Sequence, residues 1–132
     1  MKTSRHPIAS ITVLLCIGTG ITACIDHSLN TSSRTVVATA YTSDPEQTDG
    51  TPFVPACGGE LVPGDRAIAI SRDLKKHGLT CGASVIINGD EWTVRDVMNK
   101  RYSNRIDLYM GVDEQAARQF GKRRVEIQWR QS

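Results

Sequence analysis

Short segments of alternating or β-branched apolar residues recur along most of this chain, and they constrain its fold more than any other feature. Such segments are typical of half-buried strands, in which alternate side chains face the core. Asn88-Gly89 predicts a tight hairpin, because a type I′ turn needs positive φ at both central residues. Strands are predicted at residues 36–42, 66–71, 84–87, 92–94, 105–110 and 123–130.

Two short helical segments interrupt the strand patterns. Asp113 can cap a helix that ends at Gly121, and a second helical turn at 72–77 ends at Gly78. Six short strands with one or two short helices, in a domain of about 100 residues, favour a small β-barrel over a sandwich or a βαβ sheet. Side chains fill a barrel of this size, so a ligand is expected in a surface groove across its mouth. Such a groove suits an extended polymer.

Residues 1–24 have the pattern of an export signal. Lys2 and Arg5 precede an apolar stretch at 8–17 that is too short for a stable membrane span. The segment Ile21-Thr22-Ala23-Cys24 resembles a bacterial lipobox, in which Cys24 is acylated, although a plain secretory signal cut near Ala23 has a similar pattern. Either way the mature protein is expected outside the cytoplasm. A lipid at Cys24 would anchor it facing the periplasm, and Ile25 favours the outer membrane if the cell is Gram-negative.

The remaining chain divides into a predicted flexible tether at 25–34, rich in Ser, Thr and Asn, and one compact domain at 35–132. The leader holds two of the 16 basic residues and none of the 14 acidic ones, so the mature chain is neutral. That balance gives no support for nucleic-acid binding. A local basic run from Arg118 to Arg130 is interpreted as a solvated helix end and edge strand, with a surface for an anionic polymer as the alternative.

Cys57 and Cys81 are the cysteines that remain when the leader and the lipid site are set aside. In an exported protein such a pair most simply forms one disulfide. His27 and His77 do not stand near these cysteines at any spacing typical of zinc sites. No metal or cofactor is therefore predicted.

Three aspartates, Asp49, Asp96 and Asp107, stand in strand-like surroundings. An ordinary aspartate has a pKa near 3.9, so only about one in a thousand is protonated at pH 7. Burial and a second carboxylate nearby can raise that pKa and retain a proton for acid catalysis. A solvated role is the commoner explanation for any single aspartate. Asp107, however, interrupts an apolar strand pattern, where a carboxylate is costly to bury without a reason.

Four motifs, in order, carry a resemblance to a known family. They are VATAYT at 37–42, TDGTP at 48–52, VRDVMN at 94–99 and RIDLY at 105–109. Together they resemble the bacterial three-aspartate (3D) domain, over nearly all of residues 35–129. The resemblance implies a double-psi β-barrel, the fold of the catalytic domain of membrane-bound lytic transglycosylase A and, with different sequences, of expansins and rare lipoprotein A.

The resemblance also implies an activity. Family members cleave the β-1,4 bond between N-acetylmuramic acid and N-acetylglucosamine in peptidoglycan and leave a 1,6-anhydro end. Carried over by position, Asp107 would be the single general acid and base, Asp96 its close neighbour and Asp49 the third aspartate. Tyr41 and Thr42 would contact the glycan, although Tyr41 fits equally well as a half-buried strand aromatic.

Two departures from the family pattern qualify this expectation. Cys57 stands where many members have Ser or Gly, which, with Cys81, suggests a disulfide near the groove. Larger enzymes of this type also hold the glycan with a second domain, for which this chain offers no candidate. A lytic transglycosylase that acts as a monomer on peptidoglycan strands is the main hypothesis. A non-catalytic, expansin-like wall-binding module is the alternative, and a structural or inhibitory lipoprotein is a further one.

Overall fold

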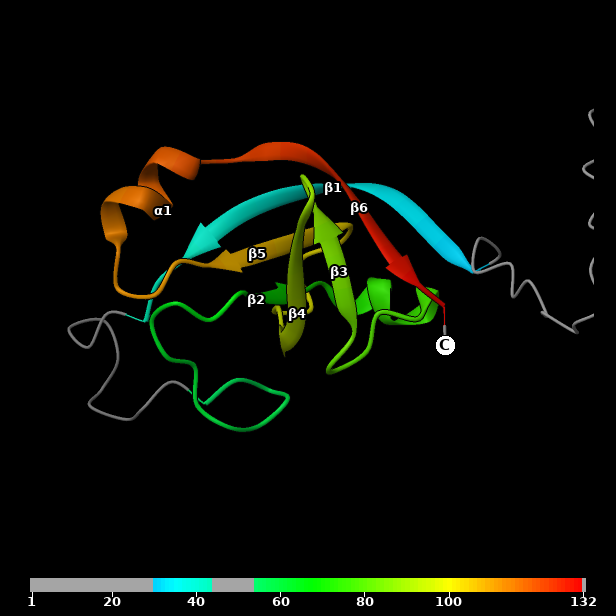
Figure 1. The fold of residues 1–132 in the computed structure, drawn as a ribbon, viewed down its shortest axis with the longest axis horizontal. Coiled ribbons are helices and arrows are strands. Elements are labelled where there is room, and N and C mark those ends of the chain that lie inside the picture. Colours follow the sequence, from blue (N-terminus) through cyan, green and yellow to red (C-terminus); the bar gives the residue numbers. More distant parts are fainter. Residues whose placement is uncertain (1–29, 44–53, 132) are drawn as a thin grey trace, which may run out of the picture.

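The computed structural model describes residues 30–43 and 54–131, and the strands in these residues close into a single barrel (Figure 1). The strand order is β1-β5-β2-β4-β3-β6, with β6 returning to β1. The predicted mainly β class, with six barrel strands and two short helices, is confirmed. The elements are β1 (Thr31–Tyr41), β2 (Ala67–Ile70), η1 (Arg72–His77), β3 (Ser84–Ile87), β4 (Asp90–Val97), β5 (Arg105–Tyr109), α1 (Glu114–Phe120) and β6 (Arg123–Arg130).

Two parallel pairs give the barrel its mixed topology. β1 runs parallel to β5, and β2 runs parallel to β4, while the other neighbouring strands are antiparallel. Parallel neighbours cannot be joined by a tight turn, so each pair comes from distant parts of the sequence. The pairing of β1 with β5 sets residues 37–41 directly beside residues 105–109.

Alternation along the strands fills the barrel interior. In β6, buried Val125, Ile127 and Trp129 alternate with exposed polar residues, as a strand with one solvated face should. Leu74 and Leu79 are fully buried near η1, and the Trp129 indole Nε1 donates to the His77 carbonyl oxygen at 2.9 Å. The main core consists of Val36, Ala38, Ile68, Ile70, Leu74, Leu79, Val85, Ile87, Val94, Ile106, Leu108, Val125, Ile127 and Trp129.

Local signals place the hairpin and the helices where the sequence predicts them. Asn88 and Gly89 have φ of 51° and 84°, which confirms the positive-φ hairpin turn between β3 and β4. The Asp113 side chain accepts the Ala116 backbone N–H at 2.8 Å and caps α1, which ends before Gly121.

The first strand begins earlier than predicted. β1 starts at Thr31, so the predicted tether at 25–34 overlaps it by its last four residues. Residues 31–34 pair antiparallel with residues 127–130 of β6. This pairing makes them a strand, although their polar side chains have no apolar alternation that would predict one. Residues 25–29 of the predicted tether and the predicted leader, including Cys24, lie outside the described residues.

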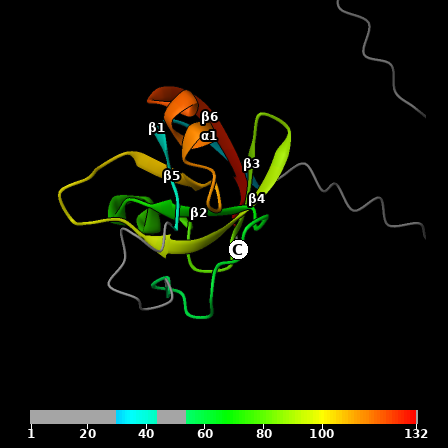
Figure 2. The same cartoon turned by 90° about the vertical axis from the view of Figure 1, so that its left-hand side faces the viewer.

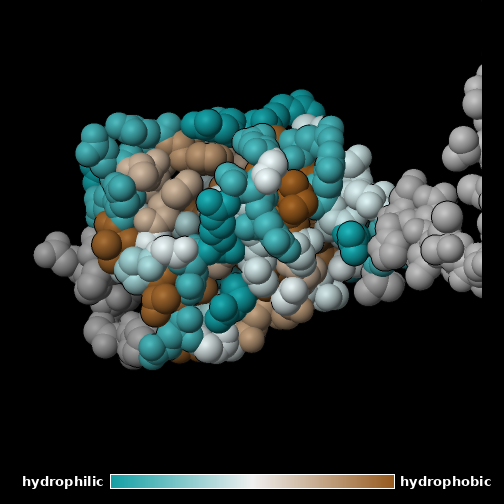
Figure 3. All heavy atoms as spheres, viewed as in Figure 1, coloured by the Kyte–Doolittle hydropathy of each residue, from teal (hydrophilic) through white to brown (hydrophobic). Residues whose placement is uncertain are grey.

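One face of the barrel is mostly polar. Figure 3 shows hydrophilic side chains over much of one face, with separate hydrophobic spots. Val54, Val62, Ile86 and Val112 are the large apolar side chains that the described part of the chain exposes. Single exposed apolar residues are normal on protein surfaces. None of the helices in residues 30–43 and 54–131 is both long and apolar enough to cross a bilayer.

Candidate functional site

Strand register brings two of the three predicted aspartates onto one row. Thr39 of β1 pairs with Asp107 of β5, Asp107 pairs with Ala69 of β2, and Ala69 pairs with Asp96 of β4. Residues paired across strands share a face of the sheet. The neighbours of Asp107 along its strand, Ile106 and Leu108, face the core. The row Thr39–Asp107–Ala69–Asp96 therefore lies on the outer face of the barrel.

A β-bulge turns Asp96 toward that outer face. Val94 pairs with Ile68 and is fully buried, and the next residue of β2, Ala69, pairs with Asp96, so Arg95 is an extra residue in β4. Without the extra residue, Asp96 would follow Val94 onto the inner face, because side chains alternate with a period of two. Bulges often redirect side chains beside functional sites.

The Asp107 carboxylate sits at the centre of the row and is partly buried. The Thr39 hydroxyl donates to its Oδ1 at 2.9 Å, and Arg105 Nη2 donates to the Thr39 oxygen at 3.3 Å. Burial raises the pKa of Asp107 above its ordinary value, although the Thr39 hydrogen bond and the Arg105 charge oppose the shift. A carboxyl group in these surroundings retains its proton at a higher pH than a solvated aspartate does.

Asp96 has a different environment. Its Oδ1 accepts the backbone N–H of Ala56 at 2.7 Å and that of Val97 at 2.8 Å. The loop that contains Ala56 is held again by Arg95, whose carbonyl accepts from Cys57 N and whose Nη2 donates to the Gly58 carbonyl. Asp96 therefore holds this loop beside the row, in addition to any role toward a ligand.

Asp96→Ala is expected to lower the free energy of unfolding by about 1–3 kcal/mol, since two backbone donors lose their charged acceptor. Asp96→Asn keeps one acceptor oxygen and should lose less. Urea unfolding measures both changes, and limited proteolysis should cut the Asp96→Ala variant faster within residues 54–62. Equal stability of the two variants would show that these hydrogen bonds do not hold the loop.

Two tyrosines lie beside the row, two residues beyond Thr39 on β1 and Asp107 on β5. The rings of Tyr41 and Tyr109 lie 5.5 Å apart between centroids, and they pack with Leu61 and Ala67. Burial raises the pKa of Tyr41 well above its ordinary value, and the Asp96 and Asp107 charges raise it further. By register, Tyr41 lies two residues from Thr39 on the same face of β1 and is therefore diagonal to Asp107.

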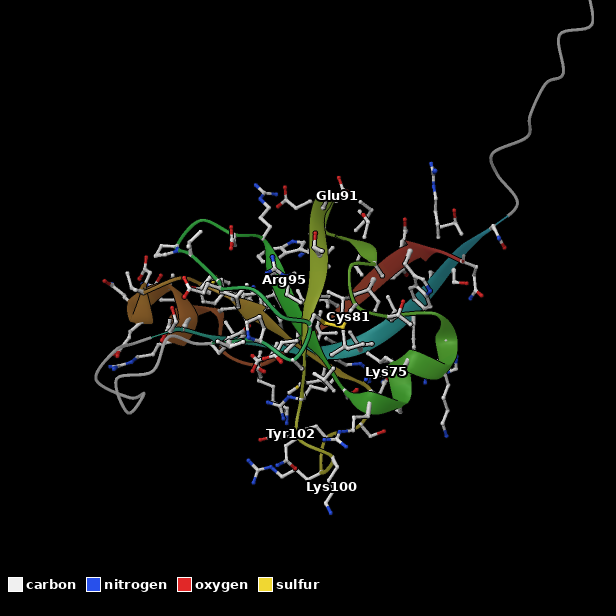
Figure 4. All side chains as sticks on the ribbon, turned by 90° about the horizontal axis from the view of Figure 1, so that it is seen from below. Lys75, Cys81, Glu91, Arg95, Lys100 and Tyr102 are labelled. Carbon is white, nitrogen blue, oxygen red and sulfur yellow. A yellow bond between two sulfur atoms is a disulfide. The ribbon has the colours of Figure 1, made fainter. Side chains whose placement is uncertain are left out.

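The predicted disulfide between Cys57 and Cys81 is present. It joins the loop that Asp96 holds to the turn before β3, and Figure 4 shows Cys81 and Arg95 in the same region of the barrel. The loop at 55–59 is therefore held by a covalent bond as well as by hydrogen bonds.

A hollow of about 760 Å³ opens elsewhere on the molecule. It is lined by residues of β1, β3, β4 and β6 and of the segment 78–83, and neither Asp96 nor Asp107 contributes to it. The volume of this hollow, taken alone, would favour it as the functional site. The carboxylate row, however, contains Asp107, whose pKa is raised, and other polar groups that converge beside it. The row is therefore the better candidate for chemistry, and its described part is a surface rather than a deep cavity.

The predicted site residues have unequal positions. Asp107, Asp96 and Tyr41 come together on the outer face, whereas no hydrogen bond within residues 30–43 and 54–131 joins Thr42 to either carboxylate. Asp49 lies outside the described residues. Sequence reasoning missed Thr39 and Arg105, although both share the alternation that sets Tyr41 and Asp107 on one face.

No protein-family model matches this chain. No curated protein matches it either. Two similar solved structures are both of an expansin from Clavibacter michiganensis. The apo expansin has 20% sequence identity and a TM-score of 0.49, over 73% of this chain and 49% of that chain. A mutant expansin in complex with cellohexaose has 18% identity and a TM-score of 0.45, over 74% of this chain and 49% of that chain. This chain thus spans about half the length of those expansins, and the likeness carries no argument about function.

Proposed function

We propose that this protein binds the glycan strands of bacterial peptidoglycan across the outer face formed by β1, β5, β2 and β4. The observation that carries the proposal is the row Thr39–Asp107–Ala69–Asp96, with Tyr41 diagonal to Asp107 on the same face. The resemblance of residues 35–129 to the three-aspartate domain is the reason for proposing peptidoglycan as the polymer and for assigning the barrel to the double-psi type.

The physical character of this face suits a sugar polymer. Hydroxyl and carboxylate groups on a strand surface can hydrogen-bond sugar hydroxyls, and small Ala69 leaves space between Asp107 and Asp96. The Cα atoms of these two aspartates are about 10 Å apart, because two strand spacings separate β5 from β4. An extended ligand can lie across such a row without a deep cavity.

Thr39→Arg is expected to weaken binding to purified sacculi at least about tenfold, because a long side chain would cover the row. Ser33→Arg is the matched control, since Ser33 lies exposed on the same strand and face but pairs with Gln128, away from the carboxylates and from Arg105. Co-sedimentation at increasing sacculus concentration measures the affinity. If the wild-type chain stays in the supernatant throughout, the proposed function is wrong.

Cleavage of the glycan is the second candidate function, and the raised pKa of Asp107 is the observation that favours it. Protonated Asp107 would give its proton to the oxygen of the β-1,4 bond as the bond to muramyl C1 breaks. The C6 hydroxyl of the same sugar would then attack C1 and return its proton to the Asp107 carboxylate. The products are a free N-acetylglucosamine end and a 1,6-anhydromuramyl end, with no water consumed.

The other aspartates would have supporting roles in that reaction. Asp96 would hold the loop at 55–59 and add negative charge near the developing positive charge at C1, while Asp49 is proposed as the third member from the resemblance alone. The disulfide favours an exported protein, because such bonds persist outside the cytoplasm. Acylation of Cys24 and attachment to the outer membrane remain part of the proposal.

A further inference from the structure

Arg101, in the connection between β4 and β5, and Arg105, the first residue of β5, lie against one aromatic ring in that connection. The guanidinium carbons of Arg101 and Arg105 each lie 4.7 Å from the centroid of the Tyr102 ring. Arg101 Nη2 also donates to the Tyr102 hydroxyl at 2.7 Å. Figure 2 shows this connection extending to one side of the barrel, and Figure 4 shows Tyr102 and Lys100 near its end. Stacking on the ring fixes the positions of two otherwise flexible cations.

Neither cation forms an ion pair within residues 30–43 and 54–131, although the Arg105 charge acts on Asp107 from beyond ion-pair distance. The ion pairs in that part of the chain join Arg66 to Asp90 and Arg118 to Glu114. Arg105 Nε is buried and has no hydrogen-bond acceptor among the described residues. A buried N–H without an acceptor is costly, and such a group in a native protein calls for an explanation.

The cationic cluster adjoins the carboxylate row. Arg105 and Asp107 are two residues apart on the outer face of β5, a distance of about 7 Å along a strand. Arg105 Nη2, Thr39 Oγ1 and Asp107 Oδ1 form a continuous hydrogen-bonded chain. A polymer that crosses the row at Asp107 would therefore bring a neighbouring unit to the two arginines.

We propose that Arg101 and Arg105, held against Tyr102, bind a carboxylate carried by the glycan strand. This inference rests on the proposed glycan binding and names the group that is recognised on the Arg105 side of the row. The muramyl sugar carries a lactyl group that is a free carboxylate when the stem peptide has been removed, and the stem peptide has carboxylates of its own. The guanidinium fork matches the two oxygens of a carboxylate, which neutral sugars do not offer.

Three soluble glycans of equal length test the inference on the mature chain, with affinity measured by calorimetry. One is a chitin oligosaccharide, which has the same linkage and no carboxylate. The second is peptidoglycan strand stripped of stems by an amidase, and the third is the strand with its stems. The wild-type chain should bind at least one carboxylate-bearing glycan about tenfold more tightly than the neutral one. Tighter binding of the stem-free strand identifies the lactyl carboxylate as the group bound. Tighter binding of the stem-bearing strand identifies a stem carboxylate.

Arg101→Gln and Arg105→Gln should each reduce that preference about fivefold or more. Arg101→Gln should also leave the affinity for the chitin oligosaccharide unchanged, because no hydrogen bond among the described residues joins Arg101 to the row, whereas Arg105 donates to Thr39 within it. Arg123→Gln is the matched control, because Arg123 also stacks on an aromatic ring, Phe120, at 4.2 Å, and belongs to β6. Arg101 is exposed, so its variant tests the inference even if the Arg105 variant folds poorly.

Equal affinity of the wild-type chain for all three glycans would overturn the inference and leave glycan binding in place. An equal loss in Arg123→Gln would also overturn it, because the preference would then reflect general positive charge. Binding to none of the glycans would overturn the proposed function and, with it, this inference.

Discussion

Asp107→Asn is expected to reduce the release of 1,6-anhydromuropeptides from sacculi by roughly 10²–10⁴-fold, the usual contribution of a general acid and base. Asparagine has nearly the same shape and can still accept the Thr39 hydroxyl, but it cannot give or take a proton. Binding to sacculi should therefore persist while the products disappear. Mass spectrometry of the soluble products measures the first effect, and co-sedimentation measures the second.

Asp90→Asn is the control for this substitution. Asp90 is exposed and pairs with Arg66 at the surface, where an ion pair contributes little to stability. Its variant should release products at the wild-type rate. Full product release by Asp107→Asn would contradict the catalytic role. No product from the wild-type chain at any concentration, with binding retained, would support the binding module instead.

The pH dependence of stability gives an independent check on Asp107. Its pKa is higher in the folded state than in the unfolded chain, so the folded state holds the proton more firmly. The resulting stabilisation is present below the unfolded pKa and is lost as the pH rises through the folded pKa. Asp107→Asn has no such loss, so its stability relative to wild type should rise between pH 3 and pH 7. Urea unfolding at the two pH values measures the difference.

Local chemistry explains why much of the fold could be predicted. The Asn88-Gly89 turn, the Asp113 cap and the alternation of Val125, Ile127 and Trp129 each depend on residues that are neighbours in sequence. Asp107 stood out for the same reason, because a carboxylate interrupts an apolar strand. Such signals can be found in a single sequence without knowledge of the tertiary structure.

Register between distant strands explains what could not be predicted. The bulge at Arg95 that turns Asp96 outward depends on how β4 meets β2, and no residue type in the motif at 94–99 marks it. The loop-holding role of Asp96 depends on Ala56, 40 residues away in sequence. Arg105 is connected to Asp107 through Thr39, and this connection exists only because β1 places Thr39 beside Asp107. These features depend on tertiary contacts between distant residues, whereas sequence patterns reveal only the structure of residues that are close in sequence.

Removing the disulfide is expected to lower the free energy of unfolding by about 3 kcal/mol, from the loop-closure entropy of a crosslink. The sequence separation of Cys57 and Cys81 is 24. A loss of this size is a large fraction of the roughly 5–15 kcal/mol that stabilises a typical domain. Urea unfolding of the mature chain from residue 25, with and without dithiothreitol, measures it. The double variant Cys57→Ala/Cys81→Ala should match the reduced protein and show no response to the reductant.

The disulfide joins a loop to a turn rather than two barrel strands, and this position determines what its loss should change. The hydrogen bonds of the six strands do not depend on it, so the reduced barrel should keep its strand content by circular dichroism. Asp96 and Arg95 would then hold the loop at 55–59 alone, and glycan binding across the row should weaken along with stability. An unchanged unfolding midpoint in dithiothreitol, with the thiols shown to be free, would mean that the crosslink contributes nothing to either property.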